Sequence, residues 1–212
     1  MFKTSYAAAA AVMLIGGSAS AATFSFTSSS YLDSNKQMTV DGLTLTAYAG
    51  IYADKPLSGA NKDEILAADC SVSSTCSGYV SQSGSGLGVA GNSFLFFPDS
   101  SFIDGTTFDD LLTLSFSQTV DFSKVDFSFW DDSDTFDLFV DGQLVAPEER
   151  SGETPFWLSG LRGTSISFGA DSIDDQFKLA SITVAPVPVP AAGLMLLGGL
   201  GGLAALRRKK KS

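Results

Sequence analysis

The chain of 212 residues has room for one domain of about 150–170 residues once two terminal signal-like segments are set aside. Hydrophobic residues make up 44% of it and charged residues only 17%, which argues against a disordered chain. There is no histidine, and this excludes Ser-His-Asp triads, Cys-His dyads and histidine-ligated zinc or haem.

Charge is distributed unevenly along the chain. Residues 23–188 contain seven basic and 23 acidic residues, a formal charge of −16, whereas five of the last six residues are basic. An acidic body of this kind repels nucleic acid and suits cations or solubility in a salty medium. We therefore expect no nucleic-acid partner.

The N-terminus has the pattern of a secretory signal peptide. Lys3 precedes an apolar stretch over residues 6–17, and the small residues Ala19 and Ala21 stand at the positions of a cleavage site. A buried N-terminal helix is the alternative, but the flanking residues fit export better. We predict a signal peptide over residues 1–21 and an exported protein.

Alternation of apolar and polar residues dominates the body. It is clearest over residues 23–27, 112–117 and 125–129, and period two is typical of strands with one buried face. Asp41-Gly42 and Asp141-Gly142 separate alternating runs and predict two-residue hairpins, because both residues of a type I′ turn need positive φ. Further strands are predicted at residues 94–97, 155–158, 164–168 and 177–184.

Eight to ten short strands with frequent turns predict an all-β fold, an antiparallel β-sandwich of jelly-roll type over residues 22–184. One helical turn is expected at residues 61–68, where Asn61 is a candidate N-cap. The Gly- and Ser-rich residues 77–91 are expected to form a flexible loop, since no helix or lysine follows that would cradle a phosphate.

The body holds two cysteines, Cys70 and Cys76. In an exported chain the expected state is a disulfide that closes a small surface loop. A zinc site would need two more ligands without histidine, and a catalytic thiol would lack its base.

Carboxylates are the other concentration of chemistry. Four of them follow one aromatic strand within seven residues: Asp131, Asp132, Asp134 and Asp137. Ca²⁺ binds six to eight oxygen ligands, so these residues are candidates for a structural calcium site, although the segment is not an EF-hand. The alternative is a set of solvated acidic loops that keep an exported protein soluble.

Two tryptophans are candidates for sugar binding. Trp130 and Trp157, together with Tyr79, would form an aromatic platform if their rings faced solvent. Aromatic side chains more often belong to the core or its edge, and this alternative stays open.

The C-terminal residues 185–212 have three parts. Pro186, Pro188 and Pro190 favour an extended spacer, and an uncharged block of sixteen residues, 191–206, follows it. As a helix this block is about 24 Å long, short for a membrane span unless its flanks enter the interface. The chain then ends in a basic cluster that would keep this end cytoplasmic: Arg207, Arg208, Lys209, Lys210 and Lys211.

This order of proline motif, hydrophobic block and basic cluster resembles the PEP-CTERM class of bacterial sorting signals. The motif residues resemble the VPLPA variant, with Val189 in place of Leu: Val187, Pro188, Val189, Pro190 and Ala191. The resemblance implies a single transmembrane helix that tethers the protein transiently to the inner membrane, and cleavage near the motif by an exosortase-type transpeptidase. A plain anchor that is never cut is the alternative. The later half of the body also resembles the sandwich domains found before such tails.

The sequence thus predicts an exported protein of the cell envelope or extracellular matrix with no catalytic activity of its own. A carbohydrate-binding module that acts on exopolysaccharide is the alternative from another class. A hydrolase is a third possibility, disfavoured by the missing histidine.

Overall fold

The structure is a computed structural model that describes residues 20–27, 31–53, 64–73, 76, 78–91, 100–105, 109–149 and 154–188. Residues Ser20–Val187 form one compact unit, and the two ends of the chain form a second unit of which only Pro188 is described. The predicted signal peptide, the hydrophobic block and the basic cluster lie outside the described residues.

The described chain contains strands and no helix. The strands are β1 (Ala22–Ser25), β2 (Gln37–Val40), β3 (Leu43–Ala53), β4 (Glu64–Ala67), β5 (Tyr79–Ser83), β6 (Gly86–Ala90), β7 (Ile103–Asp104), β8 (Asp110–Ser128), β9 (Phe136–Val140), β10 (Gln143–Glu149), β11 (Phe156–Trp157), β12 (Arg162–Gly169) and β13 (Gln176–Pro186). Every pairing between them is antiparallel, which confirms the all-β prediction. The finer prediction, a sandwich of jelly-roll type, stays a prediction.

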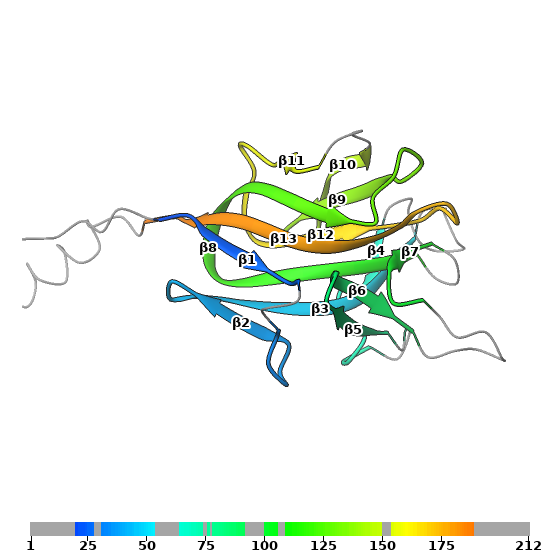
Figure 1. Cartoon of the computed structure of the whole chain (residues 1–212), viewed down its shortest axis with the longest axis horizontal. Helices are drawn as coiled ribbons and strands as arrows, with labels where there is room; N and C mark the ends of the chain where they lie inside the picture. Colours follow the sequence, from blue (N-terminus) through cyan, green and yellow to red (C-terminus); the bar gives the residue numbers. More distant parts are fainter. Residues whose placement is uncertain are drawn as a thin grey trace, which may run out of the picture. The chain divides into compact units, whose positions relative to one another are not determined.

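The sheet is organised around the 19-residue strand β8. Residues 110–116 of β8 pair with β3 on one edge, and residues 111–115 pair with β12 on the other. Residues 120–128 pair with β13 and β11, and Val120 and Asp121 also pair with β12. Residues 117–119, between the two halves, are exposed. Figure 1 shows the β8 ribbon running to one end of the body, turning and returning, so one long sheet folds back over itself.

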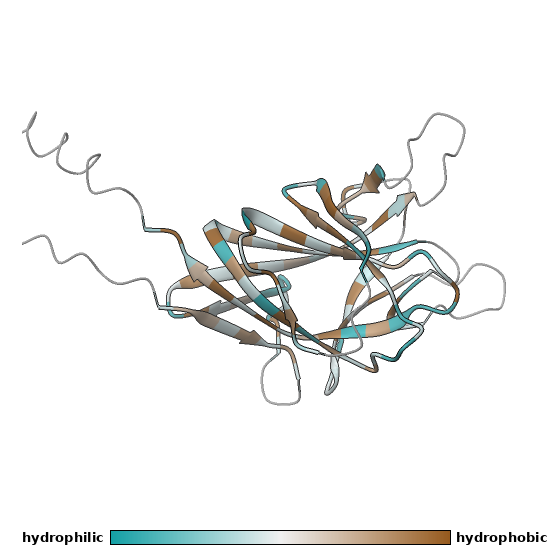
Figure 2. Cartoon of the chain, turned by 90° about the horizontal axis from the view of Figure 1, so that it is seen from above, coloured by the Kyte–Doolittle hydropathy of each residue, from teal (hydrophilic) through white to brown (hydrophobic). Residues whose placement is uncertain are grey.

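Alternation in β8 explains how both halves bury the same kind of side chain. Leu112 and Phe116 face the interior from the first half, and Val125 and Phe127 do so from the second. These side chains stand at even-numbered positions in the first half and at odd-numbered positions in the second. This change coincides with a register shift against β13 just before Lys124. Figure 2 shows the resulting bands of hydrophobic and hydrophilic residues along the long ribbons.

The core is richest in aromatic rings around Phe127. Five rings have centroids 5.0–5.5 Å from its ring: Trp130, Phe136, Phe156, Phe168 and Phe177. We call these six residues the Phe127 cluster. Most of its pairs are edge-to-face, an arrangement that adds about 0.5–1.5 kcal/mol per pair to the area buried.

Both predicted Asp-Gly hairpins are confirmed. Asp41 and Gly42 have φ values of 51° and 80° between β2 and β3, and Asp141 and Gly142 have 48° and 76° between β9 and β10. Both turn residues are left-handed, as a type I′ turn requires.

The helical turn predicted at residues 61–68 is wrong where the structure describes it. Residues Glu64–Ala67 form β4, which pairs with Ile51 and its neighbours at the edge of β3. A weak local helix propensity yields here to backbone hydrogen bonds at an open sheet edge. Residues 61–63 lie outside the described chain, as does the strand predicted at residues 94–97.

The flexible loop predicted over residues 77–91 is also wrong, because β5 and β6 form a hairpin there. Glycine serves close packing in this segment: a Cβ on Gly88 would lie 2.1 Å from the carbonyl oxygen of Ser101. A composition that resembles a linker therefore encodes two strands whose backbone approaches its neighbours closely.

Candidate functional site

The Cys70–Cys76 disulfide is confirmed, with Cα atoms 5.2 Å apart. The backbone N–H of Cys70 donates to the carbonyl oxygen of Ala49 at 2.7 Å, which ties the segment after β4 to β3. A Cβ on Gly78 would lie 3.5 Å from the sulfur of Cys70, so the start of β5 packs against the disulfide. The bridge thereby holds together the segments that enclose a surface hollow.

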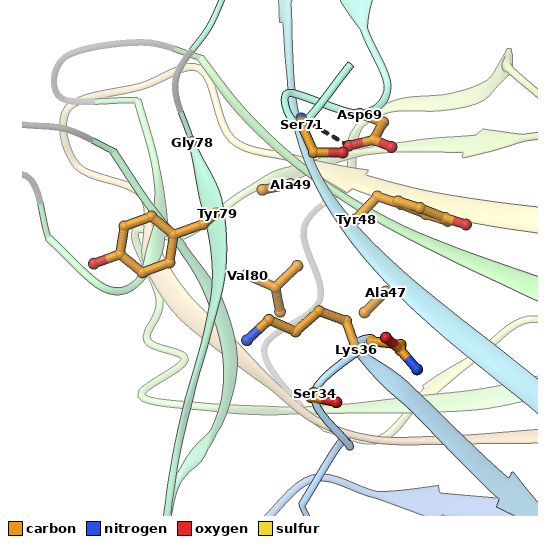
Figure 3. A pocket seen from close by; sticks show the side chains of 11 residues that line it. Ser34, Lys36, Ala47, Tyr48, Ala49, Asp69, Ser71, Gly78, Tyr79 and Val80 are labelled. Carbon is orange, nitrogen blue, oxygen red and sulfur yellow. Dashed lines mark hydrogen bonds between the residues drawn. The ribbon is translucent and has the colours of Figure 1, made fainter. Parts of the chain in front are cut away.

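This hollow, which we call the groove, has a volume of about 230 Å³ and is lined by four short segments: residues 34–36, 47–49, 69 and 71, and 78–80. Ala47, Ala49 and Val80 are buried and form its apolar floor. Figure 3 shows Tyr48 and Tyr79 on opposite sides of this floor, pointing away from each other, with Lys36 and Asp69 at its two ends. The groove thus has an apolar base between two aromatic rings and two charged groups.

The edge of β3 is incompletely paired inside the groove. Ala47 donates its N–H to the Lys36 carbonyl at 2.9 Å, and Ala49 accepts from Cys70. β2 pairs with β3 only up to Thr46, and β4 pairs with it only from Ile51. Strand alternation points the Ala47 carbonyl and the Ala49 N–H into the interval between, where no strand of the described chain pairs with them.

Two turns fix the polar ends of the groove. The Asp33 carboxylate accepts from the N–H groups of Asn35 and Gln37 at 2.8 and 2.9 Å, which holds the turn that carries Lys36. Lys36 itself has a φ of 60°, so the chain leaves the edge of β3 there. At the other end, an Asp69 oxygen accepts from the N–H of Ser71 at 2.9 Å.

The four aspartates predicted to bind calcium serve different local roles. Asp131 accepts from the N–H and the hydroxyl of Ser133, which lowers its pKa, and Asp132 is exposed. Asp137 is buried and accepts from the N–H of Glu148 at 2.7 Å. Among the described residues, no group of three or more Asp, Glu or Cys residues could hold a metal ion.

Asp134 instead forms a reciprocal arrangement with Asp175, which we call the aspartate clasp. Asp134 accepts from the backbone N–H groups of Asp131 at 2.6 Å and Gln176 at 2.8 Å. Asp175 accepts from those of Ser172 at 3.1 Å and Thr135 at 2.8 Å. Each carboxylate closes its own turn and holds the start of the other strand.

The clasp carboxylates are 1% exposed. Burial raises the pKa of both Asp134 and Asp175 above the ordinary value, and the backbone hydrogen bonds that favour the charged form only partly oppose this effect. The clasp is thus a structural device that joins the loop before β9 to the loop before β13.

A buried tyrosine lies beside further carboxylates. Tyr52 is 2% exposed, and burial raises its pKa strongly, assisted by the nearby charges of Asp137 and Asp171. The phenol of Tyr52 therefore stays protonated beside these carboxylates.

The two candidate tryptophans lie in different environments. Trp130 is half-buried, and its ring stacks on Phe127 at 5.4 Å, so it belongs to the core. Trp157 is 72% exposed and borders a cavity of about 270 Å³ with Phe156, Leu158 and Leu161. The fold does not bring the two together as one platform, because Trp130 packs inward among phenylalanines.

Sequence reasoning missed Lys178, a buried cation. It is 3% exposed, and its Nζ donates to the Ser101 hydroxyl at 3.0 Å and the Ser83 hydroxyl at 3.4 Å. The same nitrogen lies 4.9 Å from the centroid of the Phe102 ring. Burial without a facing carboxylate among these contacts lowers the pKa of the amine.

The ends of the body lie side by side. β1 pairs with β13 so that Ala22 faces Val184, and both residues are at most 1% exposed. The N–H of Val187, the first residue of the predicted sorting motif, donates to the Thr119 carbonyl at 3.0 Å. Val187 and Pro188 are described, whereas Val189, Pro190, Ala191 and residues 207–211 lie outside the described chain.

Helices that could cross a membrane are absent from the described part of the chain. No family model, no curated protein and no solved structure matches the sequence or the fold.

Proposed function

We propose that the protein is exported, tethered to the inner membrane by its C-terminal helix during sorting, and cleaved near Val187 by an exosortase-type transpeptidase. The released body is a non-catalytic protein of the cell envelope or extracellular matrix, with a β-sandwich of jelly-roll type. The membrane contact is transient, and the transpeptidase is the partner that recognises the motif at residues 187–191.

The observation that carries this proposal is the position of the two ends of the sheet. A signal peptidase cut after Ala21 leaves β1 whole, because β1 begins at Ala22. A cut within residues 187–191 leaves β13 whole, because β13 ends at Pro186. Both predicted cuts therefore fall just outside the paired strands, and each spares every backbone hydrogen bond between β1 and β13.

The disulfide gives independent support for export. Disulfides persist in oxidising compartments and are rare in the cytosol. Cys70–Cys76 therefore fits a body that resides beyond the inner membrane.

Intact-mass analysis of the native protein tests the proposal. We expect an N-terminus at Ala22 and a C-terminus within residues 187–191. Replacement of the five basic residues 207–211 by Ser should leave an uncut form in the membrane, whereas R207K/R208K, which keeps the charge, should be processed normally. Full-length protein with both ends uncut in the cytosol would refute the proposal.

Carbohydrate binding is the second candidate, favoured by aromatic side chains that face solvent. Trp157 is 72% exposed and Tyr79 is 56% exposed, and each borders a hollow on the surface. Such rings are suited to stack on the apolar faces of sugars. Exopolysaccharide is the partner that this candidate implies.

A further inference from the structure

The groove combines hydrogen-bonding groups of both kinds on an apolar floor. Ser34, Asn35 and Ser71 can donate or accept, Lys36 donates, and Asp69 accepts. The floor consists of the small side chains of Ala47, Ala49 and Val80, so it leaves space rather than filling it. An apolar surface edged by convergent polar groups is the usual design of a small-molecule site.

The incomplete edge of β3 adds two backbone groups with fixed positions. No strand of the described chain pairs with the Ala47 carbonyl or the Ala49 N–H, so the first can accept a hydrogen bond from a ligand and the second can donate one. A ligand with both donors and acceptors gains two bonds here without ordering any side chain. Hydroxyl groups serve both purposes, and a pyranose ring carries several of them around an apolar face.

The two tyrosines extend this surface to either side. Tyr79, which is 56% exposed, and Tyr48, which is half-exposed, point away from each other across the floor. They cannot sandwich one ring between them. A chain of sugars laid across the groove would instead place one unit on the floor and further units against the tyrosine rings.

Charge selects among polysaccharides. Residues 23–188 carry a formal charge of −16, which repels anionic chains. Lys36 is the one cation among the residues that line the groove, and Asp69 lines its other end. The net balance at the site therefore offers no attraction for a carboxylated or sulfated chain.

We propose that the groove binds a neutral polysaccharide chain, with one sugar unit over Ala47 and Ala49 and neighbouring units against Tyr48 and Tyr79. This inference rests on the proposed function, since a matrix protein would meet such chains outside the cell. The disulfide preorganises the site because Cys70 bonds Ala49 and packs against Gly78, which holds Asp69 and Tyr79 in place.

The cavity beside Trp157 is the competing site, and it has fewer suitable groups. It is lined mainly by apolar side chains such as Phe136, Leu138 and Leu161, with Glu149 and Ser159 as its polar side chains. A sugar there would stack on the Trp157 ring beside these two polar side chains, whereas the groove offers five: Ser34, Asn35, Lys36, Asp69 and Ser71. The groove is therefore the better site for a polyhydroxylated ligand.

Isothermal titration of the full chain, purified in detergent, tests the proposal with defined probes. Cellohexaose, mannohexaose and xylohexaose are the neutral probes, and hexagalacturonate is the anionic one. We expect at least one neutral hexasaccharide to bind, its monosaccharide to bind more than tenfold more weakly, and hexagalacturonate to bind no better than the monosaccharide. Failure of all three neutral probes to bind at millimolar concentration would overturn the proposal.

Matched tyrosine variants locate the site. Tyr79→Ala should weaken binding of the neutral probe at least tenfold, whereas Tyr31→Ala, at a ring 60% exposed that does not line the groove, should leave it unchanged. Both variants should melt at the wild-type temperature because both rings face solvent. Loss of binding in Trp157→Ala with full binding in Tyr79→Ala would place the ligand elsewhere and overturn the assignment.

The proposed export and the proposed ligand fail separately. Binding is measured on purified protein, so it does not depend on how the chain was processed. Normal processing without any glycan binding would refute the groove assignment alone, and glycan binding by a protein that is never exported would refute the proposed function.

Discussion

The Phe127 cluster and the groove use interior space in opposite ways. In the cluster, five aromatic rings lie within 5.5 Å of the Phe127 ring and fill the space around it. At the groove, the residues that face inward are Ala47, Ala49 and Val80, and a space of about 230 Å³ stays open. Large rings thus fill the space around Phe127, whereas small side chains on the floor of the groove leave space for a partner.

Burial of side chains should contribute more to stability in the Phe127 cluster than at the groove. Burial of a large aromatic side chain contributes on the order of 2–3 kcal/mol, whereas an alanine contributes far less. The groove keeps its shape by other means: the disulfide, the Asp33 turn and two backbone hydrogen bonds at the edge of β3. Variants in the two regions should therefore have separable effects on stability and on binding.

The largest expected effect is in the cluster. Phe127→Ala should lower the free energy of unfolding by about 3–5 kcal/mol, because it removes one ring from contact with five others and leaves a cavity. Urea denaturation measures this. Phe129→Ala is the control, since that ring is 58% exposed, and it should cost less than about 1 kcal/mol. Equal losses in the two variants would show that the cluster is not the centre of the core.

The aspartate clasp bonds the residues just before Phe136 and Phe177 of the cluster, and its loss should have the next largest effect. Asp175→Asn should cost about 1–3 kcal/mol at neutral pH, because the new amide NH₂ faces a backbone N–H that lost its acceptor. Asp174→Asn, at an exposed neighbour, is the control and should change little.

The clasp also sets a dependence on pH. Since burial raises the pKa of Asp175 in the folded state, the folded protein holds this proton more tightly than the unfolded chain. Its contribution to stability is complete below the unfolded pKa of 3.8 and falls as pH rises through the folded pKa. In Asp175→Asn the free energy of unfolding should fall less with rising pH, because only the contribution of Asp134 remains. Urea denaturation from pH 3 upwards measures this, and a pH dependence equal to that of the wild type would contradict it.

Most of the strands could be predicted from local sequence patterns. The alternation of apolar and polar residues predicted strands that the structure shows within β8 and β13, and the Asp-Gly pairs predicted both hairpins. Each of these signals depends on residues that are adjacent in sequence. β4 escaped prediction because it pairs with β3, which does not adjoin it in sequence. The β5–β6 hairpin escaped prediction because its glycines resemble a linker, whereas Gly88 serves a close contact with Ser101.

The site was less predictable for the same reason. Asp131, Asp134 and Asp137 are close in sequence, but the fold gives each a different backbone partner. The groove arises where β2 leaves the edge of β3 and β4 has not yet joined it, and no residue pattern marks that interval. The disulfide could be predicted, since it followed from two cysteines and the expectation of an exported chain.

Removal of the disulfide should separate binding from stability at the groove. Cys70→Ser/Cys76→Ser should lower the free energy of unfolding by about 2 kcal/mol, as expected for a loop of this length, which is less than the loss in Phe127→Ala. Affinity for the neutral hexasaccharide should fall more than tenfold because Asp69 and Tyr79 are no longer held. Full affinity in this variant, measured by titration at a temperature where it is folded, would show that the bridge does not organise the groove.

The smallest expected effect, and the one of opposite sign, is at Lys178 beneath β5. Lys178→Met should raise the free energy of unfolding by about 1 kcal/mol, because the partners of the buried amine among the described residues are two hydroxyls and one ring, and a thioether of similar length needs none. Since burial lowers the pKa of Lys178, the unfolded chain binds the extra proton between the folded pKa and 10.5, so wild-type stability should rise with pH across that window. This rise should be absent in Lys178→Met and present in the control Lys124→Met. Urea denaturation of both variants from pH 7 to 10.5 measures it. If the free energy of unfolding of the wild type does not change with pH in this window, and that of Lys178→Met does not either, water reaches the amine. β5 would then cover Lys178 less tightly than the aromatic rings cover Phe127.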